Sequence, residues 1–425
     1  MDRLRKAVES GASYAFDVLE RLVAQPSTVG QEACAQEVLA QELAVAGFEL
    51  TSLEIPASIG ADPAAGVPSR SYAGRYDLVG QRGTVEAGLP SLLINGHIDV
   101  VPAADAAGWE NPPFVANVKE GWMTGRGAGD MKGGFAAGLL ALQALDKVEP
   151  GWLNGRLTWV SAIEEECTGN GTLAAGRAGY LAEAALLLEP TDLGILLGGI
   201  SIVWVGIEIE GLAGHAEAAQ RSVNPVLGAM RVIEGLRRLE TTMNDQHAGG
   251  DDPDAAFVNI AHPYNVNVGT FHAGDWASSV PAFARLEVRV GHPASWSSDA
   301  AFAHVQAAVA AATKDDEWLC SHPPRLVQTG YRAQRHVQDV DAHVVTRLGA
   351  AHRAAHGSEP VFGTIASTTD ARFYINQFGL PAVAYGPRTR NMHGTNEAVE
   401  LASILDCADT VARFLLDWFA PRQAL

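Results

Sequence analysis

The chain has 425 residues, of which 47% are hydrophobic and 19% are charged, a composition typical of globular proteins with length for two or three domains. Its 49 acidic residues outnumber its 30 basic residues, so the formal net charge is -19. This charge, without any cluster of Lys and Arg, makes nucleic acid and anionic membranes poor candidates for partners.

The N-terminus mixes charges at helical spacing and lacks the apolar core of a signal peptide. No apolar run is long enough to span a bilayer. The four cysteines are scattered without a C-x-x-C pair, which fits a reducing compartment and argues against a thiolate zinc site. We therefore expect a cytoplasmic protein without a membrane partner.

The first half of the chain alternates helix-like and strand-like segments. Amphipathic or small-residue patterns predict helices at 2–24, 31–46 and 132–148, and apolar runs predict strands at 91–101, 156–163 and 184–190. Continuous apolar strands between helices are typical of a sheet that is covered on both faces. The pattern therefore predicts an α/β fold with a largely parallel sheet.

The pattern changes near residue 198. Alternating strands and two helices, the helices at 224–240 and 298–313, indicate a compact inserted α+β domain. The α/β pattern then resumes with a helix at 338–356, a buried strand at 380–387 and a closing helix at 398–418. We predict a discontinuous catalytic domain, formed by residues 1–198 and 330–425, and an inserted domain formed by residues 199–329.

Potential metal ligands follow several of these strands. Ligands of open α/β sheets bind beyond the carboxyl ends of the strands, so side chains in these places should lie close together. The candidates are His97 and Asp99 in "GHIDVV", Asp130 in "GRGAGD", Glu164, Glu165 and Glu166 in "SAIEEECTGNGT", Glu189 in "LLLEPT", and His393 in "NMHGTNE".

Three adjacent glutamates after an apolar strand repel one another and resist desolvation, so a solvated turn is the simplest interpretation. Five segments that end in His or carboxylate at one sheet edge favour a different interpretation. Divalent zinc, cobalt or manganese accepts such ligands, and two metals can share a bridging carboxylate. Cations make clustered carboxylates tolerable, and a carboxylate left off the metals can act as a general base.

An alternative for "GRGAGD" is a dinucleotide or phosphate loop. Asp130 interrupts the G-x-G-x-x-G spacing, and no Lys-Ser/Thr pair follows to make a P-loop. The metal interpretation is therefore preferred.

Taken together, these motifs resemble the dinuclear zinc amidohydrolase and peptidase family that includes acetylornithine deacetylase, succinyl-diaminopimelate desuccinylase, aminoacylase and glutamate carboxypeptidase. The resemblance runs over nearly the whole chain. It rests on "GHIDVVPA", "GRGAGDMKGG", "EEECTGNG", "LEPT", "GLAGHA", "TDARFY" and "MHGTNE".

The resemblance implies a site with two divalent metal ions per chain, Zn²⁺ foremost, with Co²⁺ or Mn²⁺ as alternatives. It assigns His97 and Glu189 to one metal, Glu166 and His393 to the other, and Asp130 to the bridge. Asp99 would orient His97 by accepting its second ring proton. Glu165 would be the general base, an assignment that depends on aligning the glycine of the following loop with Gly171. Glu164 stands where the family more often has Asp.

The inserted domain resembles the lid and dimerisation domain of the family. His215 in "GLAGHA" would cross to the active site of a partner subunit and stabilise the oxyanion. Arg289 in "RLEVRV" would contact the substrate carboxylate, with an ordinary salt bridge on a strand as the alternative. Ser278 stands where many relatives carry Asn, which affects the expected substrate contacts of the lid.

The function implied is metal-dependent hydrolysis of the amide bond in an N-acyl amino acid or a related small N-acyl compound, by a homodimer. Glu189 favours this choice, because dipeptidase and aminopeptidase branches more often have Asp there. Alternatives are a dipeptidase or carboxypeptidase, acting on peptides, and a catalytically silent binding protein with the same fold. The silent protein would be marked by loss of a ligand or of the base, and the sequence contains them all.

Overall fold

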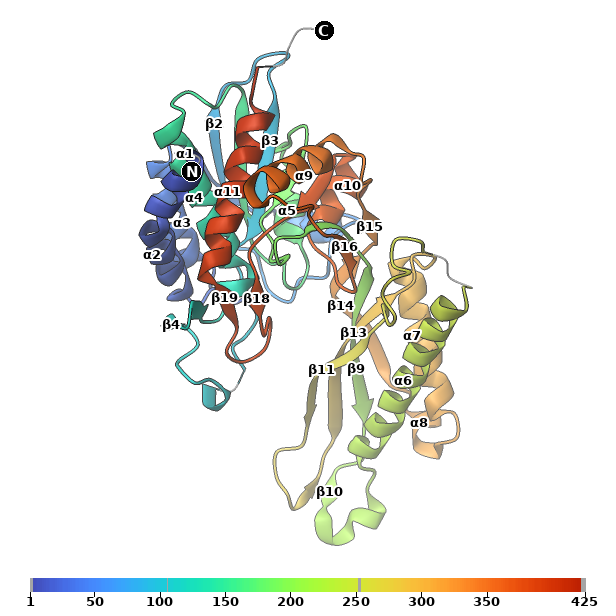
Figure 1. Cartoon of the computed structure of the whole chain (residues 1–425). Helices are drawn as coiled ribbons and strands as arrows, with labels where there is room; N and C mark the ends of the chain where they lie inside the picture. The colour runs from blue at the N-terminus through green and yellow to red at the C-terminus, as the bar shows by residue number, and fades with distance from the viewer. Residues whose placement is uncertain (1–2, 105, 251–253, 422–425) are drawn as a thin grey trace.

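The computed structural model describes residues 3–104, 106–250 and 254–421. The predicted domain ranges also contain residues 1–2, 105, 251–253 and 422–425, which lie outside the described residues. Figure 1 shows two lobes, one built around a large sheet and one around a smaller sheet.

The large sheet has nine strands in the order β1-β2-β6-β3-β7-β17-β8-β15, with β16 paired to β8. Its centre, β6-β3-β7-β17, is parallel, and antiparallel pairs occur towards both edges. The expected largely parallel sheet is therefore confirmed. The strands are β1 (Glu49–Glu54), β2 (Tyr76–Gly83), β3 (Ser91–His97), β6 (Arg156–Ala162), β7 (Ala185–Leu187), β8 (Ile195–Gly199), β15 (His336–Val337), β16 (Phe362–Ile365) and β17 (Ala382–Ala384).

Helices cover both faces of this sheet, as the apolar strands require. Leu92 and Ile94 of β3 join one buried cluster with α4 and α11, whereas Leu93 joins another with α5 and α10. The helices of this lobe are α1 (Arg3–Ser10), α2 (Ala12–Val23), α3 (Ala33–Val45), α4 (Gly133–Val148), α5 (Asn170–Arg177), α9 (His343–His356), α10 (Ala371–Phe378) and α11 (Leu401–Trp418).

The helix predicted at 2–24 is two helices that meet at Gly11. A Cβ at Gly11 would lie 2.5 Å from a methyl carbon of Leu140 and 2.7 Å from the side-chain oxygen of Gln143. The close approach of the N-terminal helices to α4 therefore requires glycine at the break.

The second lobe, residues 201–333, is called the lid below. Its four-stranded antiparallel sheet has the order β11-β13-β9-β14, and α6 and α7 pack on one face of it. The alternation predicted for the first strand is observed, because Val203, Val205 and Ile207 are buried in the core of the lid. Its elements are β9 (Ser201–Glu210), α6 (Pro225–Gly249), β11 (Val266–Ala273), β13 (Phe283–His292), α7 (Ser298–Thr313), α8 (Glu317–Ser321) and β14 (Arg325–Ala333).

The last lid strand, β14, runs beyond residue 329, the predicted domain boundary, to Ala333. At the other end of the lid, β10 (Gly214–His215) pairs with β12 (Ser279–Val280). In Figure 1, β10 lies at the end of the lid that is far from the large sheet.

A small sheet in the order β18-β19-β5-β4 joins two distant parts of the chain next to the large sheet. Because residues 398–400 pair with β5, the predicted closing helix begins only at Leu401. Its strands are β4 (Asn117–Lys119), β5 (Trp122–Thr124), β18 (Thr389–Arg390) and β19 (Ala398–Glu400). Short 3₁₀ or π turns lie at Ala57–Ala61, Ala106–Gly108, Ala128–Lys132 and Ala216–Arg221.

No helix in the described part of the chain combines the length and the apolar character that crossing a membrane requires.

Candidate metal centre

Three neighbouring parallel strands bring the predicted ligands to one edge of the large sheet. β3 ends at His97 and pairs in parallel with β6 on one side and β7 on the other. Glu166 follows β6, and Glu189 follows β7. Asp130 comes from the π-helical turn before α4, and His393 from the loop between β18 and β19.

These five side chains form two groups that share Asp130. His97, Asp130 and Glu189 form the first group, and Asp130, Glu166 and His393 form the second, with ligand atoms within 4.8 Å of one another in each. The His97 Nε2 atom lies 3.1 Å from Asp130 Oδ1 and 3.7 Å from Glu189 Oε2. The His393 Nε2 atom lies 3.1 Å from Glu166 Oε2 and 3.3 Å from Asp130 Oδ2. Each oxygen of Asp130 thus faces one histidine, as a bridging carboxylate would.

The residues present fit two divalent cations. Two ligands of a tetrahedral zinc ion, at bonds of about 2.0–2.2 Å, lie roughly 3.3–3.6 Å apart, which is close to the separations above. The centre also concentrates carboxylates, and Glu189 Oε1 is buried without a hydrogen-bond partner in the described residues. Buried carboxylates in such number require cations or protons to balance them.

Both histidines hold protons strongly in this environment. The negative charge of Glu166 and the hydrogen bond with Asp130 raise the pKa of His393 to about 11. Burial by itself would lower the pKa of His97, but the charge of Glu189 and the hydrogen bond with Asp130 outweigh it and hold the pKa well above its usual value. Metal ligation needs neutral imidazoles, so metal binding here would release protons.

The three adjacent glutamates point to different places. Glu166 faces His393, whereas Glu165 belongs to neither ligand group. Glu165 is buried beside Tyr331 of the lid, whose hydroxyl donates a hydrogen bond to the main-chain oxygen of Glu165 and lies 3.4 Å from its carboxylate. Burial, together with the charge of Asp370, raises the pKa of Glu165 well above its usual value. A buried carboxylate with a raised pKa is suited to accept a proton and to return it.

Glu164 turns away from the centre and into the protein. Its main chain has a φ of 62°, a left-handed conformation, and its side chain is buried. The carboxylate accepts hydrogen bonds from Tyr72 (2.6 Å), Thr168 (2.9 Å) and Arg75 (2.5 Å). Arg75 also pairs with Glu32. Glu164 therefore anchors the turn through a fully paired carboxylate and takes no place among the ligands.

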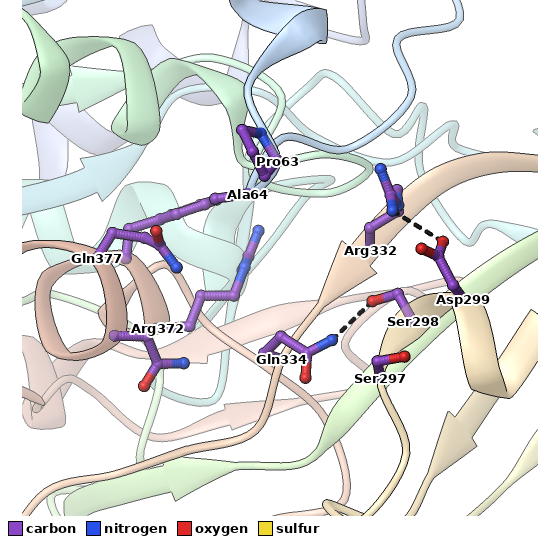
Figure 2. A pocket seen from close by; sticks show the side chains of 11 residues that line it. Pro63, Ala64, Ser297, Ser298, Asp299, Arg332, Gln334, Arg372 and Gln377 are labelled. Atoms are coloured by element: carbon purple, nitrogen blue, oxygen red, sulfur yellow. Dashed lines mark hydrogen bonds and ion pairs between the residues drawn. The ribbon is translucent and has the colours of Figure 1, made fainter.

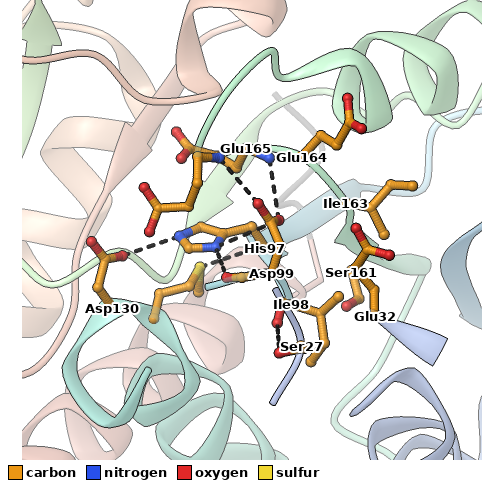
Figure 3. A network of polar contacts seen from close by, with 12 residues as sticks. Ser27, Glu32, His97, Ile98, Asp99, Asp130, Ser161, Ile163, Glu164 and Glu165 are labelled. Carbon is orange, nitrogen blue, oxygen red and sulfur yellow. Dashed lines mark hydrogen bonds and ion pairs between the residues drawn. The ribbon is translucent and has the colours of Figure 1, made fainter. Parts of the chain in front are cut away.

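Asp99 holds the same turn from the other side (Figure 3). Its two carboxylate oxygens accept hydrogen bonds from the main-chain N–H groups of Glu165 and Glu166, both at 3.2 Å. The Nδ1 atom of His97 lies 2.9 Å from the main-chain carbonyl oxygen of Asp99 and 3.8 Å from its carboxylate. The contact expected between the Asp99 carboxylate and His97 is thus made by the carbonyl, because the carboxylate is engaged by the glutamate turn.

The lid residues lie apart from this cluster. The side chain of His215 is 72% exposed at the far end of the lid, so the structure does not bring it to the metal centre of its own chain. The residue that follows His215 is held by Ser278, whose carbonyl accepts a hydrogen bond from Ala216 N at 3.0 Å. Arg289 donates to the carbonyl oxygen of Ala366 at 3.2 Å, and burial lowers its pKa. The described residues give Arg289 no carboxylate partner, so the alternative of a strand salt bridge finds no support among them.

Several residues near the centre had no role in the sequence analysis. Tyr331 touches Glu165, and Arg372 donates to the carbonyl oxygen of Thr168 at 3.1 Å, behind the glutamate turn. Arg372, Arg126 and Glu397 stand in the quoted motifs "TDARFY", "GRGAGD" and "MHGTNE", which were a signal for them. Tyr331 lies in no motif.

A cavity of about 330 Å³ lies between the two lobes (Figure 2). Arg372 from α10, Arg332 from the end of the lid and Gln334 just after the lid line it, and Arg332 pairs with Asp299 at 3.0 Å. Arg372 also lies over the ring of Tyr331. None of the predicted site residues lines this cavity, so it is separate from the metal centre.

A family model described as peptidase family M20/M25/M40 matches residues 93–417. The fold resembles the solved di-peptidase Dug1p from Saccharomyces cerevisiae, with a TM-score of 0.79 and 16% identity, covering 99% of each chain. Human carnosine dipeptidase 1 matches with a TM-score of 0.76 and 13% identity over 98% of this chain and 99% of that one. The Bacillus subtilis YXEP protein, described as a dinuclear metal-binding peptidase of the M20 family, matches with a TM-score of 0.60 and 15% identity over 97% and 99%. These comparisons confirm the expected family and two-lobed fold.

Proposed function

The chain belongs to peptidase family M20/M25/M40, a family of hydrolases, and within it we propose a metal-dependent deacylase that cleaves the amide bond of N-acyl amino acids or related small N-acyl compounds. The observation that carries the proposal is the pair of ligand groups sharing Asp130, with the buried carboxylate of Glu165 left outside both. Ligands for two cations and a separate base supply the parts that metal-assisted hydrolysis of an unactivated amide uses.

His97, Asp130 and Glu189 would hold one divalent cation, and Asp130, Glu166 and His393 the other. Zn²⁺ suits these ligands, and Co²⁺ and Mn²⁺ also accept them. When bound, the cations supply Lewis acidity, which polarises the scissile carbonyl and makes water a better nucleophile.

Glu165 is the residue that moves the proton. Its raised pKa and position beside the ligand groups suit it to accept a proton from the attacking water and to deliver that proton to the leaving amine. The Tyr331 hydroxyl, held against Glu165, limits the positions that this carboxylate can adopt. Arg289, a desolvated guanidinium beside the other lobe, offers a charged partner for a substrate carboxylate.

The proposed functional unit is a cytoplasmic homodimer. His215 lies at the end of the lid far from the large sheet, so a two-fold arrangement of lids would be needed to present it to a metal centre. There His215 of the partner subunit would stabilise the oxyanion that forms on the carbonyl oxygen.

A dipeptidase is the second candidate. It is favoured by the likeness of the whole chain to Dug1p and carnosine dipeptidase 1, both described as dipeptidases, at TM-scores of 0.79 and 0.76. The presence of Glu189 where dipeptidase branches more often have Asp favours the deacylase.

The test is a matched substrate panel with protein loaded separately with Zn²⁺, Co²⁺ and Mn²⁺. Each N-acyl amino acid is paired with a dipeptide that has the same C-terminal residue, and Glu165→Gln serves as the inactive control. We expect kcat/KM to be higher for the N-acyl member of each pair. Higher kcat/KM values for the dipeptides would favour the dipeptidase over the deacylase. If the metal-loaded protein hydrolyses neither kind of substrate, both proposed functions are wrong.

A further inference from the structure

Two of the metal-ligand candidates come from loops that no strand of the large sheet fixes. His393 has a φ of 61° and a side chain that is 53% exposed. Asp130 lies in a π-helical turn with non-helical backbone angles. The separations in the centre therefore depend on whatever holds these two loops in place.

One carboxylate holds the backbone of the Asp130 turn. Glu397 is only 1% exposed, and its Oε1 atom accepts hydrogen bonds from Gly129 N at 2.9 Å and Asp130 N at 3.0 Å. Its other oxygen pairs with Arg126 Nη1, and Arg126 is also 1% exposed. Glu397 thus fixes the main chain of the residue that is shared by the two ligand groups.

The arginine of this pair holds two more loops. Arg126 Nη2 donates to the carbonyl oxygens of His393 at 3.3 Å and Gly394 at 3.2 Å, in the loop of the second histidine. It also donates to the carbonyl oxygen of Pro102 at 3.3 Å, in the segment that follows His97. Through these hydrogen bonds, the Arg126–Glu397 pair holds three segments around the centre, which are the Asp130 turn, the His393 loop and the segment that follows β3.

The position of the pair in the chain explains this reach. Arg126 follows β5 and Glu397 precedes β19, and these two strands pair through Thr124 and Ala398. Gly125 N also donates to the main-chain oxygen of Glu397 at 2.9 Å. The Arg126–Glu397 pair thus lies at the end of the small sheet from which the Asp130 turn and the His393 loop both extend.

A contribution to stability does not by itself explain why a buried ion pair such as Arg126–Glu397 is present. Desolvating two charges can cost more than their attraction returns, and apolar replacements of similar volume are often neutral or stabilising. A network that fixes loop geometry at a metal site has a different use, because residues that orient ligands commonly change metal affinity about 10–100-fold when they are replaced.

We propose that Arg126 and Glu397 are positioning residues that set the metal affinity of the centre by holding the loops of Asp130 and His393. The inference deepens the proposed function and rests on its metal centre. Neither residue touches the substrate or the ions in this scheme, because both act through the main chain of the ligand loops.

The experiment measures zinc affinity by competition with a chromophoric chelator, in wild type, Glu397→Gln and Arg126→Lys. Glutamine removes the ion pair, and lysine keeps a charge for Glu397 but loses the planar group that reaches the carbonyls of several loops. We expect wild type to bind two equivalents, and each variant to bind at least one of them about 10–100-fold more weakly. Circular dichroism of the same samples establishes that the variants are folded.

A matched control and a double variant separate positioning from folding. Asp254 lies in the lid with a side chain that is 7% exposed, and Asp254→Asn removes the partner of Arg335, so this variant should leave zinc affinity unchanged. The double variant Arg126→Met/Glu397→Leu leaves neither charge unpaired but still lacks the hydrogen bonds to the main chain of the ligand loops, so its zinc affinity should stay low.

The outcomes distinguish the two levels of the argument. If wild type binds two equivalents and both single variants bind zinc as tightly, the positioning role is overturned and the proposed function stands. Recovery of full affinity in the double variant would likewise overturn it. If wild type itself binds no zinc, cobalt or manganese, the proposed function fails, and this inference with it.

Discussion

Replacing Glu164 with Gln tests whether the first of the three adjacent glutamates serves the fold and not the chemistry. Its carboxylate is buried and receives three hydrogen bonds, from Tyr72, Thr168 and Arg75. Glutamine keeps the shape but removes the charge and replaces one acceptor oxygen with an NH₂ group. That group must then face at least one of the three donors.

The expected loss of stability can be bounded from these contacts. A hydrogen bond to a charged group contributes about 1.5–3 kcal/mol, and an unpaired buried donor costs about 1–3 kcal/mol. Removing one partner of a buried ion pair costs about 3–5 kcal/mol when the other charge is left alone. Arg75 keeps Glu32 as a second partner, so we expect the free energy of unfolding to fall by about 2–3 kcal/mol.

The assay combines the denaturant midpoint with metal content and turnover. Glu164→Gln should lower the midpoint, retain two equivalents of metal, and keep turnover within about tenfold of wild type, a change of about 1.4 kcal/mol in the activation barrier. Glu234→Gln, at a lid side chain that is 63% exposed, is the control and should change none of the three. An unchanged midpoint combined with the loss of a metal would refute the reasoning, because Glu164 would then be a ligand in place of Glu166.

Three further predictions follow from other residues. Glu165→Gln should keep both metals and lose about 10²–10⁴ in turnover, and loss of metal instead would move the ligand assignment to Glu165. When Glu165→Gln and His215→Ala chains are unfolded together and reassembled, about half the dimers are mixed and each holds one complete site, so activity should return to roughly a quarter of wild type. No recovery, with mixed dimers seen by mass spectrometry, would contradict the action of His215 across the dimer. Burial, and then the charges of Arg372 and Arg335, lower the pKa of His336 to about 3. The unfolded chain binds this proton near pH 6.5, so the stability that depends on neutral His336 is present above pH 6.5 and is lost as pH falls towards 3. The advantage of wild type over His336→Gln should therefore shrink by about 2–3 kcal/mol between pH 7 and pH 4.5, whereas a difference that does not change with pH would contradict this.

The central strands were predictable because strands that are buried on both faces need apolar residues at nearly every position, which gives continuous apolar runs in the sequence. The runs at 91–101 and 156–163 became β3 and β6, and their parallel pairing brings His97 next to the glutamate turn. Helix ends were less predictable, because tertiary hydrogen bonds override local pattern. The helix expected from residue 338 begins at His343, since Gln338 bonds through its main chain to Leu197 and through its side chain to Ala382 of the large sheet.

The ligands were predictable because their chemical types are restricted, but the residues that hold them were not. Arg126 and Glu397 are 271 positions apart, and a charged residue in a glycine-rich loop gives no sign of its partner. Tyr331 reaches Glu165 from the lid, and an isolated tyrosine on a strand has no local signature of such a contact. Contacts of this kind arise from how the lobes and loops meet, which spacing along the chain does not encode.

The acids at this sheet edge differ in how their charge is balanced, and the difference bears on the state without metal. Glu164 is paired with Arg75, Glu397 with Arg126, and the Asp99 carboxylate accepts two main-chain N–H groups. Glu164 and Glu397 have their counter-charges within the folded chain, whereas burial raises the pKa of Asp99 to about 8. The ligand groups and the general base also depend on ions or protons, and the two histidines can hold protons when no metal is present. Removing the metal should therefore leave the scaffold around the centre folded, so that the metal affinities of the variants report on ligand positions and not on whether the protein folds.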